Sequence, residues 1–264
     1  MPISRRTFIH HAMFTTTATA ASAHTRAHAS ATDYLGSTPL IQTEHPRIVQ
    51  LAQDITRSAP SRVAAAVLIH DWVRDEIAFG IPGGFYDTSA METLDAKVGY
   101  CNTKVTLFQA LLRASSIPAR IRMMDLSAQV LRGLLDPGTA YVDHAIAEVF
   151  LEGRWIKVDS YVTDRPLVAV ARKKLLLSKE MAGFGIHING NSHWSGAADN
   201  FIQCLNDASI QNYVLKDHGV FADVADFYQQ SQQPRNRKTL LSSLALRLGS
   251  SFVNRQIQNV RGGG

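Results

Sequence analysis

Apolar residues recur at helical spacing in two segments of the first half of the chain. Between residues 61 and 79 they share one face with a histidine, at Val63, Ala66, Val67, His70, Val73 and Ile77. A second stripe follows the turn Val98-Gly99-Tyr100 and consists of Cys101, Val105, Phe108 and Leu112. Because residues three, four and seven positions apart share a helix face, the pattern predicts two helices that pack together. On such a stripe His70 is expected to be a core histidine rather than a second base.

The period changes to that of β-strands after Ile117-Pro118, because a proline favours extended backbone in the residue before it. The run 119–124 alternates in the manner of a strand. Two further β runs, 143–151 and 155–159, flank the turn Glu152-Gly153-Arg154, which predicts an antiparallel hairpin.

The register of this hairpin decides whether His144 can reach Asp159. With a two-residue turn at Glu152-Gly153, Leu151 pairs with Arg154 and Asp159 falls opposite Ile146. His144 and Asp159 are then diagonal neighbours on one face, within roughly 7 Å at Cβ. A three-residue turn would place them on opposite faces.

The second half of the chain predicts mostly helices. We expect them at residues 167–181, 198–215, 220–229 and 239–259, in a C-terminal extension that covers 166–264. The last helix could lie on a membrane surface, although docking on the domain is the commoner use of such a face. The segment 183–196 is rich in Gly, Asn, His and Trp; it is predicted either as a lid that contacts substrate over Cys101 or as a structured surface loop.

Composition adds a targeting signal. The chain has 264 residues, a formal charge of +5, 45% hydrophobic and 19% charged residues, which excludes a disordered or collagen-like chain. Ser4-Arg5-Arg6-Thr7-Phe8-Ile9, a weakly apolar stretch and two small-x-small sites resemble a twin-arginine export signal over residues 1–29. Its removal would take away three arginines and no acid, leaving 235 residues at +2. We therefore expect a periplasmic or secreted protein, no nucleic-acid partner and no stable membrane insertion.

The two cysteines have different surroundings. In an oxidising compartment they could form one disulfide. However, Cys204 lies in an apolar stretch that reads as helical, where a buried inert thiol is expected, whereas Cys101 begins a helix. Unpaired N–H groups and the positive end of the helix dipole favour a thiolate there, and they can also stabilise an oxyanion.

A cysteine at a helix start, a histidine on a strand and an aspartate on the next strand have the logic of a thiol triad. The ordered motifs extend this pattern: Gly99-Tyr100-Cys101, Leu111-Leu112-Arg113-Ala114, Ile117-Pro118-Ala119-Arg120, His144-Ala145, Glu148-Val149, Trp155 and Asp159. Together they resemble the bacterial transglutaminase-like superfamily over roughly residues 61–162.

The resemblance implies an α+β, papain-like core in which a catalytic helix packs on an antiparallel sheet. It further implies that Cys101 is the nucleophile, His144 the general base and acid, and Asp159 the group that orients His144. Ile146 departs from the family, which commonly has an aromatic residue after His-Ala. The family's second oxyanion donor cannot be placed: the residues that could donate or contact substrate are Tyr100, Tyr86, Trp194 and His193. Glu148 and Arg120 are expected to form structural ion pairs, although Arg120 could also clamp a substrate carboxylate.

These observations predict four segments: an export signal at 1–29, an N-terminal segment at 30–60, the catalytic core at 61–165 and the extension at 166–264. The predicted function is an exported acyl-transfer enzyme that forms a thioester on Cys101 and hydrolyses an amide or peptide bond. The alternatives are transfer of the acyl group to an amine and a non-catalytic binding domain on the same fold. Expected substrates are peptides, proteins or small amides, without a cofactor or metal, since no carboxylate-rich loop suggests calcium and His187 with His193 is a poor zinc signal.

Overall fold

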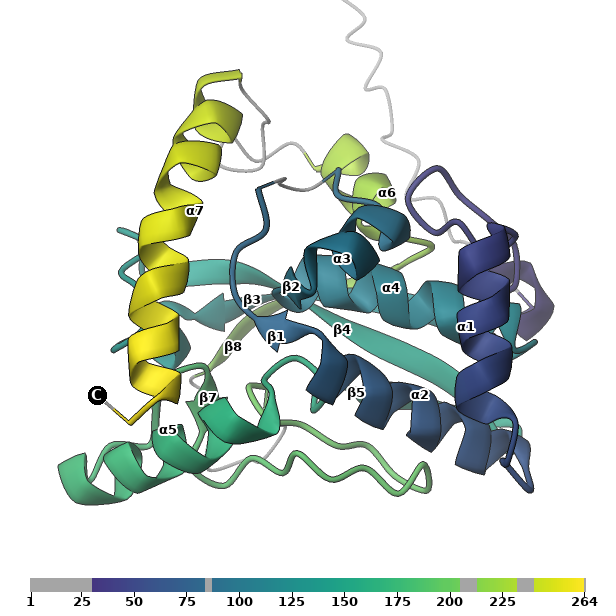
Figure 1. Cartoon of the computed structure of the whole chain (residues 1–264), viewed down its shortest axis with the longest axis horizontal. Helices are drawn as coiled ribbons and strands as arrows, with labels where there is room; N and C mark the ends of the chain where they lie inside the picture. Colours follow the sequence, from purple (N-terminus) through teal and green to yellow (C-terminus); the bar gives the residue numbers. More distant parts are fainter. Residues whose placement is uncertain (1–29, 84–86, 205–212, 232–239, 264) are drawn as a thin grey trace, which may run out of the picture.

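Helix α4, Cys101–Ala114, is the centre of the fold and is buried from Cys101 to Arg113. The structure is a computed structural model that describes residues 30–83, 87–204, 213–231 and 240–263. On one side α4 packs against α1 (Pro46–Thr56), α2 (Arg62–Glu76) and α3 (Ala90–Ala96), and on the other side against the main sheet (Figure 1). The predicted stripe therefore faces inward, but the opposite face of the helix is buried as well.

The main sheet has four antiparallel strands in the order β5-β4-β3-β8. Their bounds are Ala119–Ser127 for β3, Tyr141–Leu151 for β4, Arg154–Val158 for β5 and Val214–Phe221 for β8. Two small pairs lie outside it: β1 (Ala78–Phe79) pairs with β2 (Val98–Gly99), and β6 (Ala182–Gly183) with β7 (Ile186–His187). Helices on an antiparallel sheet confirm the predicted α+β class.

The hairpin adopts the predicted two-residue turn. Glu152 has φ of 50° and Gly153 has φ of 78°, and two consecutive left-handed residues are the requirement of a type I′ turn. Leu151 pairs with Arg154, and Ala147 with Val158. The register that brings His144 and Asp159 to one face is thus the one observed.

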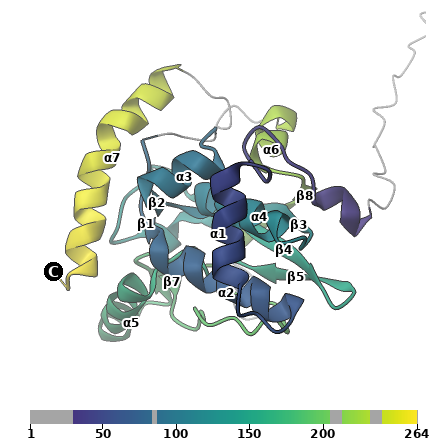
Figure 2. The same ribbon diagram turned by 45° about the vertical axis from the view of Figure 1, so that its right-hand side comes forward.

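The remaining elements are short 3-10 helices η1 (Ala31–Tyr34) and η2 (Ala128–Leu131), and the helices α5 (Arg165–Ser178), α6 (Val224–Gln230) and α7 (Leu240–Arg261). Asp164 caps α5 by accepting a hydrogen bond from the Leu167 N–H. Helix α7 runs along one flank of the molecule with its C-terminal end beside α5 (Figure 2). Because Ile257 and Val260 are buried in the core, the last helix docks on the domain.

The helix predicted at 198–215 is wrong where the structure describes it, and the helix predicted at 220–229 is observed only from Val224 onward. Residues 201–204 form an irregular segment, β8 occupies 214–221, and a helix begins only at Val224. The reason is tertiary pairing: β8 is an edge strand with two register shifts against β3, and its charged residues conceal the alternation of a strand.

The residues on which the export signal rests, 1–29, lie outside the described part of the chain, as does Tyr86. Across the described ranges, no helix combines the length and the apolar character needed to span a membrane.

Candidate active site

Cys101 occupies the first turn of α4, directly after a tight turn. A Cβ atom at Gly99 would lie 2.6 Å from Thr103 Oγ1 and 2.9 Å from Lys104 Cγ, so only glycine allows the chain to enter the helix here. Tyr100 is the N-cap residue, and its backbone N–H donates to Thr103 Oγ1 at 3.1 Å as part of a capping box. The N–H groups of the first helical turn have no partners within the helix, as in any α-helix, and they lie beside Cys101.

His144 is on strand β4 and lies beside Cys101, which begins α4. The imidazole Nε2 lies 3.1 Å from Asp159 Oδ2, and the ring also interacts with Cys101. The Cys101 sulfur itself lies 3.5 Å from Asn102 Oδ1 and 3.8 Å from the Asp143 carbonyl oxygen. Burial alone would lower the pKa of His144, but hydrogen bonds to Asp159 and to Cys101, with attraction between their charges, raise this pKa to about 9. The arrangement favours a protonated imidazole beside the sulfur at neutral pH.

Asp159 is fully buried and is held by backbone donors from a distant segment. Its Oδ1 accepts from the Ile202 N–H at 2.5 Å, and its Oδ2 accepts from the N–H groups of Gln203 at 3.2 Å and Cys204 at 2.8 Å. These three bonds fix the carboxylate toward His144. The side-chain pattern of the sequence could not predict these three bonds, because the donors are backbone groups of an irregular segment more than 40 residues downstream.

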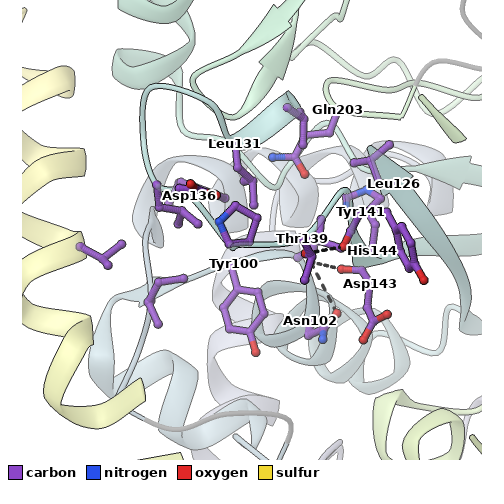
Figure 3. A pocket seen from close by; sticks show the side chains of 18 of the residues that line it. Tyr100, Asn102, Leu126, Leu131, Asp136, Thr139, Tyr141, Asp143, His144 and Gln203 are labelled. Carbon is purple, nitrogen blue, oxygen red and sulfur yellow. Dashed lines mark hydrogen bonds between the residues drawn. The ribbon is translucent and has the colours of Figure 1, made fainter. Parts of the chain in front are cut away.

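A cavity of about 600 Å³ opens beside this group and is lined by Cys101 and His144. We refer to it as the Cys101 cavity. Figure 3 shows Tyr100, Asn102, His144 and Gln203 around it, with α7 along one side. A nucleophile and a base therefore face a space large enough for a small substrate.

A family model matches the part of the chain that contains this site. Residues 49–160 match the family model of the transglutaminase-like superfamily, and the match includes Cys101, His144 and Asp159. The chain is transglutaminase-like. The match covers less than half of the chain; it supports a thiol enzyme family and agrees with the papain-like α+β fold.

Two individual proteins are also similar. An uncharacterised protein of Haemophilus influenzae is 28% identical over 185 residues, which cover 62% of this chain and 49% of that protein. The crystal structure of a proposed cysteine protease from Cytophaga hutchinsonii is 18% identical with a TM-score of 0.46, covering 74% of this chain and 47% of that one. The chain spans about half the length of each of these relatives.

A hydrogen-bonded chain crosses the mouth of the site in this transglutaminase-like protein. Asn102 Nδ2 donates to Tyr228 Oη at 2.9 Å, and Tyr228 Oη donates to Asp143 Oδ2 at 3.2 Å. The chain joins the start of α4 to the strand residue before His144 through α6. Sequence reasoning missed Tyr228, which had no motif around it.

The structure separates the residues predicted to contact substrate. Tyr100 lines the Cys101 cavity, whereas Trp194 and His193 do not. Trp194 is buried against His70, with ring centroids 5.4 Å apart, and His193 is exposed on the surface. The segment 183–196 consequently does not form the predicted lid over Cys101, and the cavity is covered instead by residues 126–143 and by α7.

The second cysteine, Cys204, belongs to the segment that supports Asp159. Cys204 is a free, buried thiol in an irregular segment rather than in the predicted helix, and Cys101 is free as well, so the disulfide alternative is not observed. Burial, followed by repulsion from Asp159, raises the pKa of the Cys204 thiol well above its usual value. Cys204 therefore acts on the site through its backbone N–H and not through its sulfur.

The predicted ion pair is present on the two central strands, β3 and β4. Glu148 accepts from Arg120 Nε at 2.7 Å and from Arg122 Nε at 2.6 Å, and the Arg120 guanidinium stacks 4.0 Å from the Trp155 ring centroid. Arg120 is thus occupied in packing. Among the residues described, no group of three or more His, Cys, Asp or Glu side chains is arranged to hold a metal ion.

Proposed function

We propose that this protein is a thiol-dependent acyl-transfer enzyme that forms a thioester on Cys101 and hydrolyses an amide or peptide bond. The observation that carries the proposal is the meeting of Cys101 with a histidine of raised pKa on the wall of a cavity. A buried core pair would have no access to substrate. The family match supports a thiol enzyme in general, and the specific reaction is our inference.

The geometry suggests how each residue acts. The Cys101 thiolate attacks the carbonyl carbon, and the oxyanion that forms faces the free N–H groups at the start of α4. The C–N bond breaks as the His144 imidazolium gives its proton to the leaving amine. Neutral His144 then takes a proton from water, hydroxide attacks the thioester, and the acid leaves as Cys101 is regenerated. Asp159, held by three N–H donors, keeps the imidazole oriented throughout.

Alkylation with iodoacetamide across a range of pH tests the activation of Cys101. We expect Cys101 to be alkylated rapidly at neutral pH and to lose this reactivity in His144→Ala. Cys204 serves as an internal control, because its buried thiol of raised pKa should stay unlabelled in the folded protein. Equal labelling of Cys101 with and without His144 would contradict the proposal.

Trapping the acyl-enzyme tests the reaction itself. Incubation with p-nitrophenyl esters and acid quenching should add the acyl mass to Cys101, with no adduct in Cys101→Ala. Added amines would reveal transamidation as an acyl-amine product in place of the free acid. Absence of both an adduct and p-nitrophenol release above the rate of Cys101→Ala would favour a non-catalytic domain.

We also propose that residues 1–29 direct export by a twin-arginine route, on the basis of Arg5-Arg6 and the small-x-small sites. Mass spectrometry of the protein from its native host should find a chain shortened near residue 29. An uncleaved chain in the cytoplasm would overturn this.

A further inference from the structure

The Cys101 cavity is apolar away from its reacting groups. Its side walls come from β3, η2, the segment after η2 and β4, and their apolar residues are Leu126, Val130, Leu131, Leu135 and Val142. The same walls also include Asp136, Pro137, Thr139, Tyr141 and Asp143. No lysine or arginine occurs among the described residues that line it. A substrate that presents a carboxylate or phosphate to the walls away from His144 would find no lysine or arginine to replace its lost hydration.

The acidic groups of the lining are already engaged in the protein. Asp136 is exposed and accepts a hydrogen bond from the Gly138 N–H in its own turn at 2.8 Å. Asp143 accepts from Tyr228 Oη. The cavity therefore offers apolar contact rather than a charged clamp to the part of the substrate beyond the carbonyl.

Helix α7 closes one side of the cavity and is anchored on the domain. Asn254 exchanges two hydrogen bonds with the backbone of Ile81, each 2.8 Å long. Arg261 pairs with Asp164 at 2.6 Å and donates to the Phe79 carbonyl at 2.9 Å. These contacts hold the helix face that carries Gly249 and Val253 against the cavity.

Gly249 leaves room at this face. A Cβ atom there would meet nothing within 4 Å, so neither packing nor a left-handed backbone requires glycine. Glycine inside a helix costs roughly 1 kcal/mol relative to alanine, according to host–guest measurements. The glycine thus keeps open a space that a larger residue would fill without a clash.

We propose that the Cys101 cavity binds the apolar acyl chain of the substrate, so that the enzyme acts on aliphatic acyl compounds rather than on charged or small acyl groups. This inference rests on the proposed thioester chemistry. The chain would lie between the β3–η2–β4 wall and α7, with its carbonyl carbon at Cys101. Each buried methylene should raise kcat/KM by about fourfold until the cavity is full.

The test is a series of p-nitrophenyl acetate, butyrate and octanoate hydrolysed by the wild type, Gly249→Leu and Ser251→Leu. We expect the wild type to prefer octanoate over acetate by at least about 30-fold, and this ratio to fall by roughly tenfold or more in Gly249→Leu. Ser251 is exposed on the other face of α7, so Ser251→Leu is the matched control and should behave as wild type. Gly249→Ala, which favours the helix, should show a smaller loss of the ratio.

Binding to Cys101→Ala separates the two proposals. Calorimetry should show N-methyloctanamide binding with a negative heat-capacity change and N-methylacetamide binding far more weakly, with Gly249→Leu in the same background removing the difference. An active wild type with no preference for chain length would overturn the acyl-chain inference and leave the thioester chemistry intact. Selective octanamide binding without any adduct on Cys101 would overturn the proposed enzyme instead. Equal binding of the two amides would refute the apolar site whether or not the protein turns over.

Discussion

Two buried histidines in this molecule have almost the same list of partners. His144 contacts the carboxylate of Asp159 and the thiol of Cys101. His70 contacts the carboxylate of Asp71 and the hydroxyl of Ser160, each at 2.8 Å. On side-chain types alone, each is a histidine between an acid and a potential nucleophile.

Their pKa values nevertheless move in opposite directions. Burial lowers the pKa of His70, and the nearby cations Arg74 and Lys104 lower it further, while Asp71 only partly compensates. Asp71 also accepts a hydrogen bond from Arg74 at 2.8 Å, and this cation offsets part of the negative charge that would otherwise raise the pKa of His70. Hydrogen bonds to Asp159 and Cys101, together with their charges, raise the pKa of His144 in spite of burial, and no lysine or arginine in the described structure pairs with Asp159.

Access to a cavity is the second difference. His144 and Cys101 line the Cys101 cavity, whereas His70 is enclosed by the rings of Phe108, Tyr161 and Trp194. An acid, a histidine and a hydroxyl or thiol within hydrogen-bonding distance are therefore not sufficient for chemistry. Charge balance and an open space distinguish a reacting group from a structural one.

The largest difference between the two histidines should appear in the rate of ester hydrolysis after each is replaced. In His144→Ala we expect ester hydrolysis to fall on the order of 10³-fold or more, because the thiol loses its base and the leaving group loses its acid. His70→Gln should lose stability, roughly 1–3 kcal/mol from broken buried hydrogen bonds, with the rate per folded molecule preserved. Steady-state kinetics on protein whose folded fraction is known from circular dichroism would measure both. A comparable loss of rate in His70→Gln would mean that the His70 cluster takes part in catalysis.

The pH profile should show the second largest effect. The wild-type kcat/KM should decline as pH rises through about 9, because deprotonation of His144 removes the proton needed by the leaving amine. Asp159→Asn removes the charge that raises this pKa, so the basic limb should move to lower pH. The shift can be measured with an amide substrate in a series of buffers from about pH 5 to about pH 10. This range brackets both the usual histidine pKa of about 6.5 and the raised pKa of His144, about 9. An unchanged basic limb in Asp159→Asn would assign the titration to another group.

The sequence predicted the parts of the site that depend on local pattern. The stripe from Cys101 to Leu112 placed the thiol at a buried helix start, and Glu152-Gly153 set the hairpin register that aligns His144 with Asp159. These elements are specified by neighbours a few residues apart. Periodicity and turn chemistry are sufficient for them.

The rest depended on long-range contacts that leave no local signal. Residues 202–204 support Asp159 through backbone N–H groups, which every residue except proline carries. β8 becomes a strand only because the edge of β3 is available, and Trp194 is drawn into the aromatic cluster around His70. The apolar cavity depends on where α7 docks, which no spacing within the helix reveals.

Stability measured against pH should resolve the smallest effect, with opposite signs for the two histidines. His70 has a lowered pKa in the folded protein, so the stability it contributes is present above the unfolded value of about 6.5 and is lost as pH falls below it. His144 has a raised pKa, so its contribution is fully present below about 6.5 and is lost as pH rises through about 9. Urea unfolding of the wild type, His70→Gln and His144→Gln should therefore give differences in unfolding free energy that grow with pH for His70 and shrink with pH for His144. If the two differences instead changed with pH in the same direction, the two sites would share one electrostatic environment, and access to the cavity alone would set them apart.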